Sequence, residues 1–460
     1  MGQRRLGKEP ERQRGSRKEQ QIVGSARYRP ESDPSVGIEV TIARVGARGD
    51  GIFDPGGAGK AGDRVFVPLT VPGDRVRVRL GPVQAEGRRG QVLAWLARGP
   101  DAVEPACHHF GRCGGCTLQH FGDPGYGAWK AEQVAAALER AGFAPDRPVP
   151  LVRTAPGGRR RATFSVQRRG GAVLVGFKER LSHRLVDLEQ CPVLAPELIA
   201  LVPVLRRGLA PVLAEGGIAE VAVTRVESGL DLVLVGPDRL GLSARQALAE
   251  LASAADLSRL SWQPRSGQPP EPVAARRPAL VRFGGYPVLV PPGAFLQASA
   301  EGEAALTAAV LTGVGAGAMA VADLFAGCGT FSLPLAGVTG RRVLGVDGNG
   351  AALAALALAG RGLPGLTIGR RDLGREPMSP QELTGYEAVV FDPPRAGAAA
   401  QAEALAASNV PVVVAVSCNP ATFARDAHHL RAGGYRLITV LAVDQFLWSA
   451  HIELVAVFNR

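Results

Sequence analysis

The sequence predicts a protein of three folded parts that ends in an α/β domain with a parallel sheet. From residue 291 to 460, short apolar strands alternate with Ala-rich helical segments, which is typical of such a sheet. Between residues 36 and 97, short strands are separated by glycine turns, and this pattern predicts a small β-barrel. The segment 98–290 mixes strand-like and helical runs, so we expect an α+β central domain there.

The C-terminal domain has the most regular pattern. Strands are expected at 319–324, 342–347, 366–369, 387–392, 411–417, 435–443 and 452–458, and helices at 349–360, 398–407 and 420–432. The loop between the last two strands is too short for a helical crossover. We therefore expect those two strands to be antiparallel and to lie at the C-terminal edge of the sheet.

Basic residues concentrate at the N-terminal end. The net charge is +11, and residues 1–30 hold nine Lys or Arg against three Glu, which predicts a disordered basic tail over residues 1–35. In the expected barrel, Arg75, Arg77 and Arg79 alternate with apolar residues, so one face of that strand is basic. Both features favour a polyanionic partner such as RNA, although a solvated tail and a solvated outer face have the same pattern.

Composition bears on the location of the protein. Hydrophobic residues form 46% of the 460 and charged residues 21%, a balance typical of globular domains. Every apolar run is too short or too charged to span a bilayer, and no apolar stretch follows the basic N-terminus as in a secretory signal. Six cysteines are too few for a disulfide framework. We expect a cytoplasmic protein without a membrane partner, most simply a monomer.

A glycine-rich turn marks the expected cofactor site. The run from Asp323 to Thr330 joins a strand to a helix, and its glycines let the backbone approach a ligand closely. The next strand ends in Asp347, which suits a ribose diol, and Asp372 follows the third strand, where it suits an adenine amino group. The spacing is not that of a pyrophosphate-binding loop, and no P-loop lysine is present. The pattern favours S-adenosylmethionine (SAM); the alternative is a sheet with ordinary turn glycines.

The expected fifth strand delivers Cys418 to the same edge of the sheet, directly ahead of a helix. Because a helix N-terminus favours a thiolate, Cys418 is predicted to be a nucleophile rather than a buried core cysteine. After the fourth strand, Asp392 precedes two prolines and Arg395. Many enzymes that methylate amino groups carry an aromatic residue in place of this arginine, so the loop argues against an exocyclic amine as the target.

Glu453 begins the last strand and is expected near the fifth one. Carbon 5 of a pyrimidine is a poor nucleophile, but a thiolate that adds to carbon 6 activates it toward a sulfonium methyl group. A base must then remove the proton from carbon 5. Cys418 and Glu453 fit these two roles, whereas His451 could face the substrate or simply pack in its loop.

Three cysteines lie within ten residues, Cys107, Cys113 and Cys116, and the distant Cys191 could add a fourth thiol. The clustering favours a metal over unligated cysteines. The residues themselves leave zinc and a [4Fe–4S] cluster open, and their spacing is not that of the radical SAM enzymes.

Together these motifs resemble the SAM-dependent RNA (uracil-5-)-methyltransferases. The matching segments are 295–297, which looks like the family's Phe-x-Gln element, 323–330, 392–395, 417–420 and 451–453. The resemblance implies a class I (Rossmann-like) methyltransferase sheet, with Cys418 as nucleophile and Glu453 as general base. The SAM contacts that it implies are Gln297, Phe325, Thr330, Asp347 and Asp372, with Asp392 between substrate and cofactor. The sequence departs from the family at Ser299 and Thr330, where Asn is usual, and at Leu447 and Ser449, where Pro and Thr are usual.

The N-terminal half extends the resemblance. Residues 37–95 look like the TRAM domain, an RNA-binding barrel of the OB type, and family members with the same cysteine spacing bind a [4Fe–4S] cluster. This implies that such a cluster, rather than zinc, is held by Cys107, Cys113, Cys116 and Cys191. Members with both features often resemble 23S rRNA enzymes, so rRNA is the expected substrate. The alternatives are a tRNA uridine, an RNA cytosine, or a non-enzymatic iron–sulfur protein that binds RNA.

Overall fold

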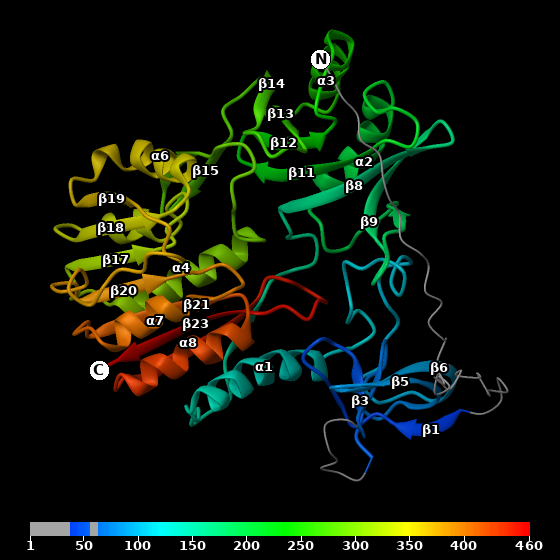
Figure 1. Ribbon diagram of the computed structural model, residues 1–460, viewed down its shortest axis with the longest axis horizontal. Helices are drawn as coiled ribbons and strands as arrows, with labels where there is room; N and C mark the ends of the chain where they lie inside the picture. Colours follow the sequence, from blue (N-terminus) through cyan, green and yellow to red (C-terminus); the bar gives the residue numbers. More distant parts are fainter. Residues whose placement is uncertain (1–36, 56–62) are drawn as a thin grey trace, which may run out of the picture. The chain divides into compact units, whose positions relative to one another are not determined.

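The computed structural model describes residues 37–55 and 63–460, which contain three sheets of six or more strands (Figure 1). The predicted basic tail, residues 1–35, lies outside the described residues. Among the helices that are described, none is both long and apolar enough to cross a membrane.

The first sheet has six strands in the order β1-β5-β6-β4-β3-β2. The strands are β1 (Ile38–Thr41), β2 (Arg44–Val45), β3 (Gly51–Phe53), β4 (Val65–Val67), β5 (Arg75–Gln84) and β6 (Gly87–Ala97). Val76 and Val78 of β5 are fully buried, whereas Arg75 is exposed and Arg77 pairs with Glu39 of β1 at 2.8 Å. The alternation of β5 between a buried and a basic face is therefore present, while closure of this sheet into a barrel stays a prediction.

The second sheet has seven strands in the order β10-β9-β8-β11-β12-β13-β14. The elements here are β8 (Arg161–Arg169), β9 (Ala172–Lys178), β10 (Leu185–Asp187), α2 (Pro196–Leu209), β11 (Ile218–Val226), β12 (Gly229–Gly236), α3 (Leu242–Ala254), β13 (Arg259–Pro264) and β14 (Glu271–Ala275), followed by the hairpin of β15 (Leu280–Phe283) and β16 (Tyr286–Leu289). Leu205 of α2 and Leu248 of α3 share one buried core with Phe164 and Leu234 of the sheet. This segment thus combines helices with a largely antiparallel sheet.

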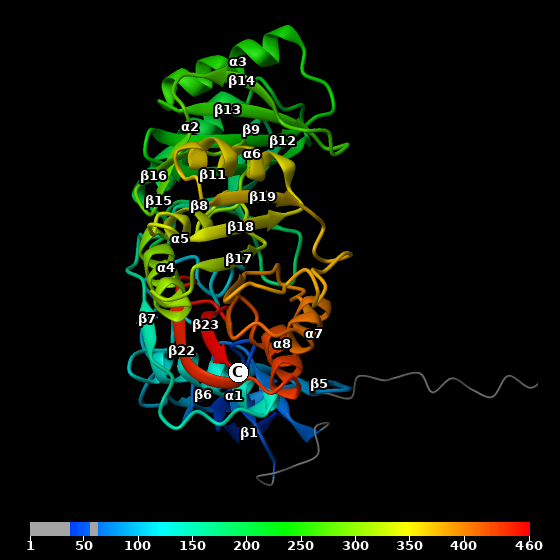
Figure 2. The ribbon, with the colours of Figure 1, turned by 90° about the vertical axis from the view of Figure 1, so that its left-hand side faces the viewer.

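The third sheet has eight strands in the order β19-β18-β17-β20-β21-β23-β22-β7 and contains all seven strands expected in the C-terminal domain. Its elements are β7 (Leu151–Arg153), α4 (Ala300–Val314), β17 (Ala320–Leu324), α5 (Ser332–Ala336), β18 (Arg342–Asp347), α6 (Gly350–Ala359), β19 (Leu366–Arg370), β20 (Ala388–Phe391), α7 (Ala399–Ala406), β21 (Val412–Ser417), α8 (Pro420–Ala432), β22 (Arg436–Asp444) and β23 (Glu453–Asn459). Strands β17 to β21 are parallel, and Figure 2 shows β17, β18 and β19 side by side. Because β23 pairs antiparallel with both β21 and β22, the expected orientation of the last two strands is confirmed.

One strand and one helix of this layer come from the segment 98–290, for which only a central domain is predicted. β7 pairs in parallel with β22, so that β7 and not β22 forms the edge of the sheet. Helix α1 (Gly125–Ala141) packs against α8 (Figure 1), and its Val134 and Leu138 share a core with Phe423. The core of the third sheet therefore includes residues on both sides of the predicted boundary at 290. β7 was not predicted because a strand of three residues has no recognisable pattern in the sequence.

Candidate active site

A cavity of about 1630 Å³ lies at the carboxyl ends of the parallel strands. Its lining includes every residue that was predicted to act in catalysis or to contact the cofactor, namely Gln297, Phe325, Thr330, Asp347, Asp372, Asp392, Cys418 and Glu453. Open α/β sheets place ligands at this edge because the loops after neighbouring strands diverge there. The structure thus brings all of these residues to one place, and their individual roles stay predictions.

The glycine-rich turn after β17 requires glycine at position 329. Gly329 has a φ angle of +98°, and a Cβ atom there would lie 2.4 Å from Cδ1 of Leu356. The nearby Gly327 donates its backbone N–H to Oδ2 of Asp347 at 2.9 Å. Oδ1 of Asp347 accepts from the backbone N–H of Asn349 at 2.7 Å. These bonds fix the carboxylate at the end of β18 between the turn and the start of α6.

The side chains at this end of the cavity fit SAM. Asp347 and Asp372 provide acceptors for the hydroxyl and amino groups of a nucleoside, and Phe325 provides an aromatic ring. Phe325 has a φ angle of +65°, an unusual conformation for a bulky residue and one that proteins tend to retain at ligand sites. These side chains suit the adenosine part of SAM, and their contacts with it stay predictions.

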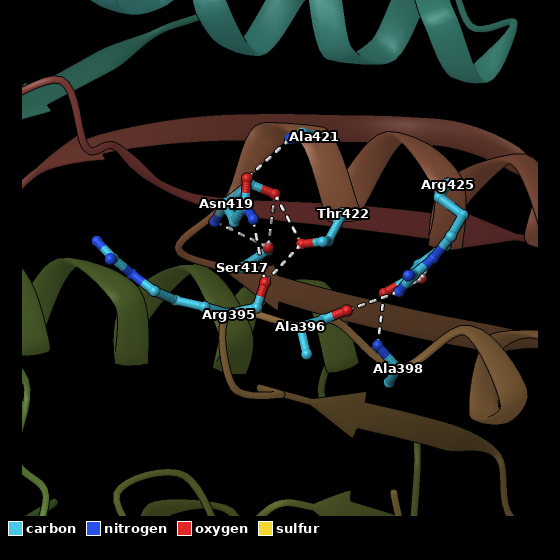
Figure 3. A network of polar contacts seen from close by, with 9 residues as sticks. Arg395, Ala396, Ala398, Ser417, Asn419, Ala421, Thr422 and Arg425 are labelled. Atoms are coloured by element: carbon cyan, nitrogen blue, oxygen red, sulfur yellow. Dashed lines mark hydrogen bonds and ion pairs between the residues drawn. The ribbon is translucent and has the colours of Figure 1, made fainter. Parts of the chain in front are cut away.

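Hydrogen bonds from Asn419 and Thr422 hold the loop after β21 (Figure 3). The side-chain amide of Asn419 donates to the carbonyl of Arg395 at 3.0 Å, and its oxygen caps α8 by accepting from the backbone N–H of Ala421 at 3.1 Å. The hydroxyl of Thr422 donates to the same Arg395 carbonyl at 3.2 Å. Asn419 therefore ties the loop after β20 to the N-terminus of α8 and limits the freedom of the cysteine beside it.

The surroundings of Cys418 favour the thiol over the thiolate. Burial raises the pKa of Cys418 to about 11, and the negative charges of Glu453 and Asp392 act in the same direction. The charge of Arg395 opposes them by lowering this pKa. The helix dipole favours a thiolate by about 0.3–1 kcal/mol at exposed positions and by up to about 2 kcal/mol at partly buried ones. That the N-terminus of α8 favours the thiolate of Cys418 therefore stays a prediction, and burial and the two carboxylates act against it.

Four side chains beside the cavity form a hydrogen-bonded chain. Nε2 of Gln445 donates to Oε2 of Glu453 at 3.0 Å and to Oε1 of Gln297 at 2.7 Å. Nε2 of Gln297 in turn donates to Oδ2 of Asp392 at 3.2 Å. Burial raises the pKa of both acids, and the charge of Asp392 raises that of Glu453 further. Glu453 therefore holds a proton more readily than an exposed glutamate, which suits a general base that works near neutral pH.

His451 lines the same cavity, where Nη2 of Arg395 lies 2.7 Å from its Nε2. Burial and the charge of Arg395 lower the pKa of His451 to about 4. The imidazole is therefore neutral near pH 7, and its Nε2 accepts from the guanidinium, which can only donate. His451 thus lines the cavity, and its contact with the substrate stays a prediction.

Arg161 is a cavity residue that the sequence analysis missed. Its guanidinium carbon lies 4.3 Å from the ring centroid of Phe295, which is itself 64% exposed. Burial lowers the pKa of Arg161 to about 10, as does the charge of Arg159, whereas the charges of Glu453 and Cys418 raise it. Its Nε has no hydrogen-bond partner in the part of the chain that the structure describes. The signal that could have identified it is a run of three arginines, the last of which begins β8.

The four cysteines predicted to bind a metal are all free thiols. Burial raises the pKa of Cys113, and the nearby thiols of Cys191 and Cys107 raise it further. Burial also raises the pKa of Cys116 to about 12. Within residues 37–55 and 63–460, no three His, Cys, Asp or Glu side chains are arranged as a metal site. The metal cluster therefore stays a prediction.

A buried ion pair holds the loop between β22 and β23, and it too was not predicted. Nζ of Lys130 on α1 lies 2.9 Å from Oδ1 of Asp444 and also donates to the carbonyl of His451. The hydroxyl of Tyr126 donates to Oδ2 of Asp444 at 2.7 Å and accepts from the backbone N–H of Trp448 at 2.8 Å. Helix α1 therefore fixes this loop at three points.

Known proteins that are similar to this chain include RNA methyltransferases. Residues 378–460 match the model of the tRNA (uracil-5-)-methyltransferase family. The chain is 44% identical to an uncharacterized RNA methyltransferase of Brucella suis, over 92% of this chain and 98% of the relative. It is 31% identical to the 23S rRNA (uracil(1939)-C(5))-methyltransferase of Yersinia enterocolitica, over 89% of this chain and 94% of the relative.

Among solved structures, the chain is similar to the tRNA (uracil-54, C5)-methyltransferase of Pyrococcus abyssi in complex with S-adenosyl-L-homocysteine. The TM-score is 0.71 at 23% identity, and the match covers 91% of this chain and 99% of that chain. The fold is thus that of a SAM-dependent methyltransferase. With its relatives taken into account, the chain belongs to the RNA (uracil-5-)-methyltransferases, which are SAM-dependent enzymes.

Proposed function

We propose that the enzyme methylates carbon 5 of a uridine through a temporary covalent bond between Cys418 and carbon 6 of the base. The observation that carries this proposal is that Cys418 and Glu453 line one cavity with the acids of the glycine-turn region. SAM supplies the methyl group when it is bound. The residues proposed to hold SAM are Gln297, Phe325, Thr330, Asp347 and Asp372, with Asp392 between SAM and the base.

The proposed reaction starts when Cys418 passes its thiol proton to solvent in the cavity and its sulfur forms a bond to carbon 6. The electron pair of the C5=C6 double bond then moves onto carbon 5 and the carbonyl at carbon 4. Carbon 5 accepts the methyl group, whose bond to the sulfonium sulfur breaks and leaves S-adenosylhomocysteine as the second product. Glu453 removes the proton from carbon 5, the double bond forms again, and the sulfur–carbon bond breaks to release the thiolate. Arg395 assists the first step because its charge lowers the pKa of Cys418.

The substrate that we propose is 23S rRNA. This choice is supported by the relative named as a 23S rRNA methyltransferase and by the basic face of β5, in residues that look like a TRAM barrel. The same proposal has the enzyme act as a cytoplasmic monomer. A tRNA substrate is the second candidate, because the family model and the similar solved structure carry that name.

A [4Fe–4S] cluster on Cys107, Cys113, Cys116 and Cys191 is part of the proposal. It is supported by four cysteines, the number of thiolates that such a cluster takes, and by the resemblance of their spacing to that of family members with a cluster. No step of methyl transfer uses the cluster. Protein purified without air should contain about four iron atoms per chain, and Cys191→Ala should lose them. Stoichiometric zinc in place of iron would contradict this part of the proposal.

The function is tested by incubating the purified protein with methyl-labelled SAM and total RNA, followed by mapping of the label. We expect 5-methyluridine in 23S rRNA. Label in tRNA alone would overturn the substrate, and label in cytidine would overturn the base. If no RNA were labelled, the proposed function would be wrong.

A further inference from the structure

Gln445 has a side chain that the proposed reaction does not yet use. It is 2% exposed, and all of its polar atoms are engaged. Oε1 accepts from the backbone N–H of Ala298 at 2.8 Å, while Nε2 donates to Gln297 at 2.7 Å and to Glu453 at 3.0 Å. A glutamine amide has two N–H donors, so both are used here.

The contact with Ala298 determines which way the amide of Gln445 points. A backbone N–H can only donate, so the atom that faces Ala298 must be the oxygen and Nε2 must face Glu453 and Gln297. Gln297 then presents its own oxygen to Gln445 and its nitrogen to Asp392. One backbone N–H therefore orients every donor and acceptor in this chain of four side chains.

Glu453 depends on Gln445 for its orientation. Glu453 is 3% exposed, and within the described residues its carboxylate has a single hydrogen-bond partner, which is Gln445. We propose that Gln445 is a positioning residue that holds the carboxylate of Glu453 toward the carbon-5 proton and links it to Gln297. This inference rests on the proposed role of Glu453 as general base.

The charged groups around Glu453 indicate what loss of Gln445 would do. Burial and the charge of Asp392 raise the pKa of Glu453, whereas the hydrogen bond from Gln445 and the charges of Arg161 and Arg395 lower it. Cys418, whose own pKa Glu453 raises, is a further titratable neighbour. Without the donor of Gln445, Glu453 would keep its proton to higher pH. Proton removal from carbon 5 would then slow, while addition of Cys418 would be less affected.

Gln445→Met tests this, because methionine has a similar volume and no donor. The enzyme is mixed with SAM and a 23S rRNA fragment, and the covalent protein–RNA complex is followed on denaturing gels over a range of pH. We expect the complex to accumulate and to break down about tenfold more slowly near pH 7. The pH profile of the breakdown rate should be displaced to higher pH by about one unit. Gln445→Glu, which keeps an acceptor for Ala298 but puts a negative charge beside Glu453, should displace the profile further in the same direction.

Gln401→Met is the matched control. Gln401 is 1% exposed, accepts from the backbone N–H of Met378 at 2.8 Å and donates to its carbonyl at 3.1 Å, so this variant also loses a buried amide and its bonds. It should lower stability and leave the pH profile of breakdown as in the wild type. A wild-type profile in both Gln445 variants, or an equal displacement in Gln401→Met, overturns the inference.

The experiments distinguish failure of the proposed function from failure of the proposed role of Gln445. If the wild type made no 5-methyluridine, or if Glu453→Gln released its RNA at the wild-type rate, the proposed function itself would be wrong. If both of those controls behaved as expected and the Gln445 variants matched the wild type, only the role of Gln445 would be wrong.

Discussion

Nζ of Lys130 lies 2.9 Å from Oδ1 of Asp444, and neither side chain is exposed to solvent. Burial lowers the pKa of Lys130, and the charge of Asp444 acts against this shift. A buried charge that loses its partner is strongly destabilising, even where the intact pair adds little to stability. The pair also fixes the loop that carries Gln445 and His451, so its loss should affect both stability and the site.

Lys130→Met should therefore lower the free energy of unfolding by about 3–5 kcal/mol, because it leaves the carboxylate of Asp444 buried without a cation. Urea unfolding measures this. An exposed pair offers the control: Arg77 lies 2.8 Å from Glu39, with side chains 43% and 52% exposed, and Arg77→Met should cost less than about 1 kcal/mol. If both variants lost the same free energy of unfolding, the buried pair would contribute no more to stability than the exposed pair.

Cys418→Ala and Glu453→Gln should have opposite effects on the covalent complex. Without the thiol, no bond to carbon 6 can form, so Cys418→Ala should show no complex with RNA on a denaturing gel. Without a base, the carbon-5 proton stays and the thiolate cannot leave, so Glu453→Gln should accumulate the complex after methyl transfer. Both should reduce turnover by about a hundredfold or more. A complex in Cys418→Ala would mean that another residue is the nucleophile.

Asp323 at the end of β17 should make stability depend on pH. Burial raises its pKa from 3.8 to about 7, against the hydrogen bond from Ser332. Between these two values the folded state keeps a proton that the unfolded state has lost, so this group makes stability fall as pH rises through that window and adds no slope above it. Asp323→Asn should remove a slope of at most about 1.4 kcal/mol per pH unit.

Urea unfolding at several pH values within that window tests the role of Asp323. Asp256→Asn is the control, because the pKa of Asp256 is lowered from 3.8 to about 2 by Arg277 and Arg276, so that this group is ionised in both states above about pH 5. The slope of the Asp256 variant should equal that of the wild type. A wild-type slope in Asp323→Asn would assign the pH dependence to another group.

The parts of the site that could be predicted are those that follow strands. Asp347 and Cys418 end apolar runs, and in a parallel sheet the ends of neighbouring strands share one edge. Their proximity therefore follows from local pattern and topology alone. The same reasoning placed the antiparallel β23 beside β21, and with it Glu453.

The parts that could not be predicted depend on contacts between distant segments. Gln445 and Gln297 are 148 residues apart, and Lys130 and Asp444 are 314 apart, with no periodic pattern that relates either pair. The pKa of Cys418 depends on burial and on two carboxylates that reach it only in the folded chain. A helix N-terminus can be recognised in a sequence, but the larger electrostatic effects around it cannot.

Gly329→Ala should weaken both the fold and the cofactor site. Alanine would have to adopt a φ angle near +98°, and its Cβ atom would lie 2.4 Å from Leu356. Gly434 is the control that isolates the cost of the backbone conformation from the cost of the clash. It has a φ angle of +89° and nothing within 4 Å of an added Cβ atom. Gly434→Ala should therefore lose only about 1–2 kcal/mol of stability, the cost of a left-handed backbone. Gly329→Ala should lose more.

Gly329→Ala should also bind S-adenosylhomocysteine more weakly, because alanine disfavours the φ angle of +98° in the turn where Gly327 donates to Asp347. Calorimetric titration of both glycine variants measures this, with urea unfolding alongside. Gly434→Ala should bind the ligand as the wild type does. If Gly329→Ala bound it equally well despite a loss of stability, the turn would not be part of the cofactor site, and Asp347 would need another explanation for its fixed position.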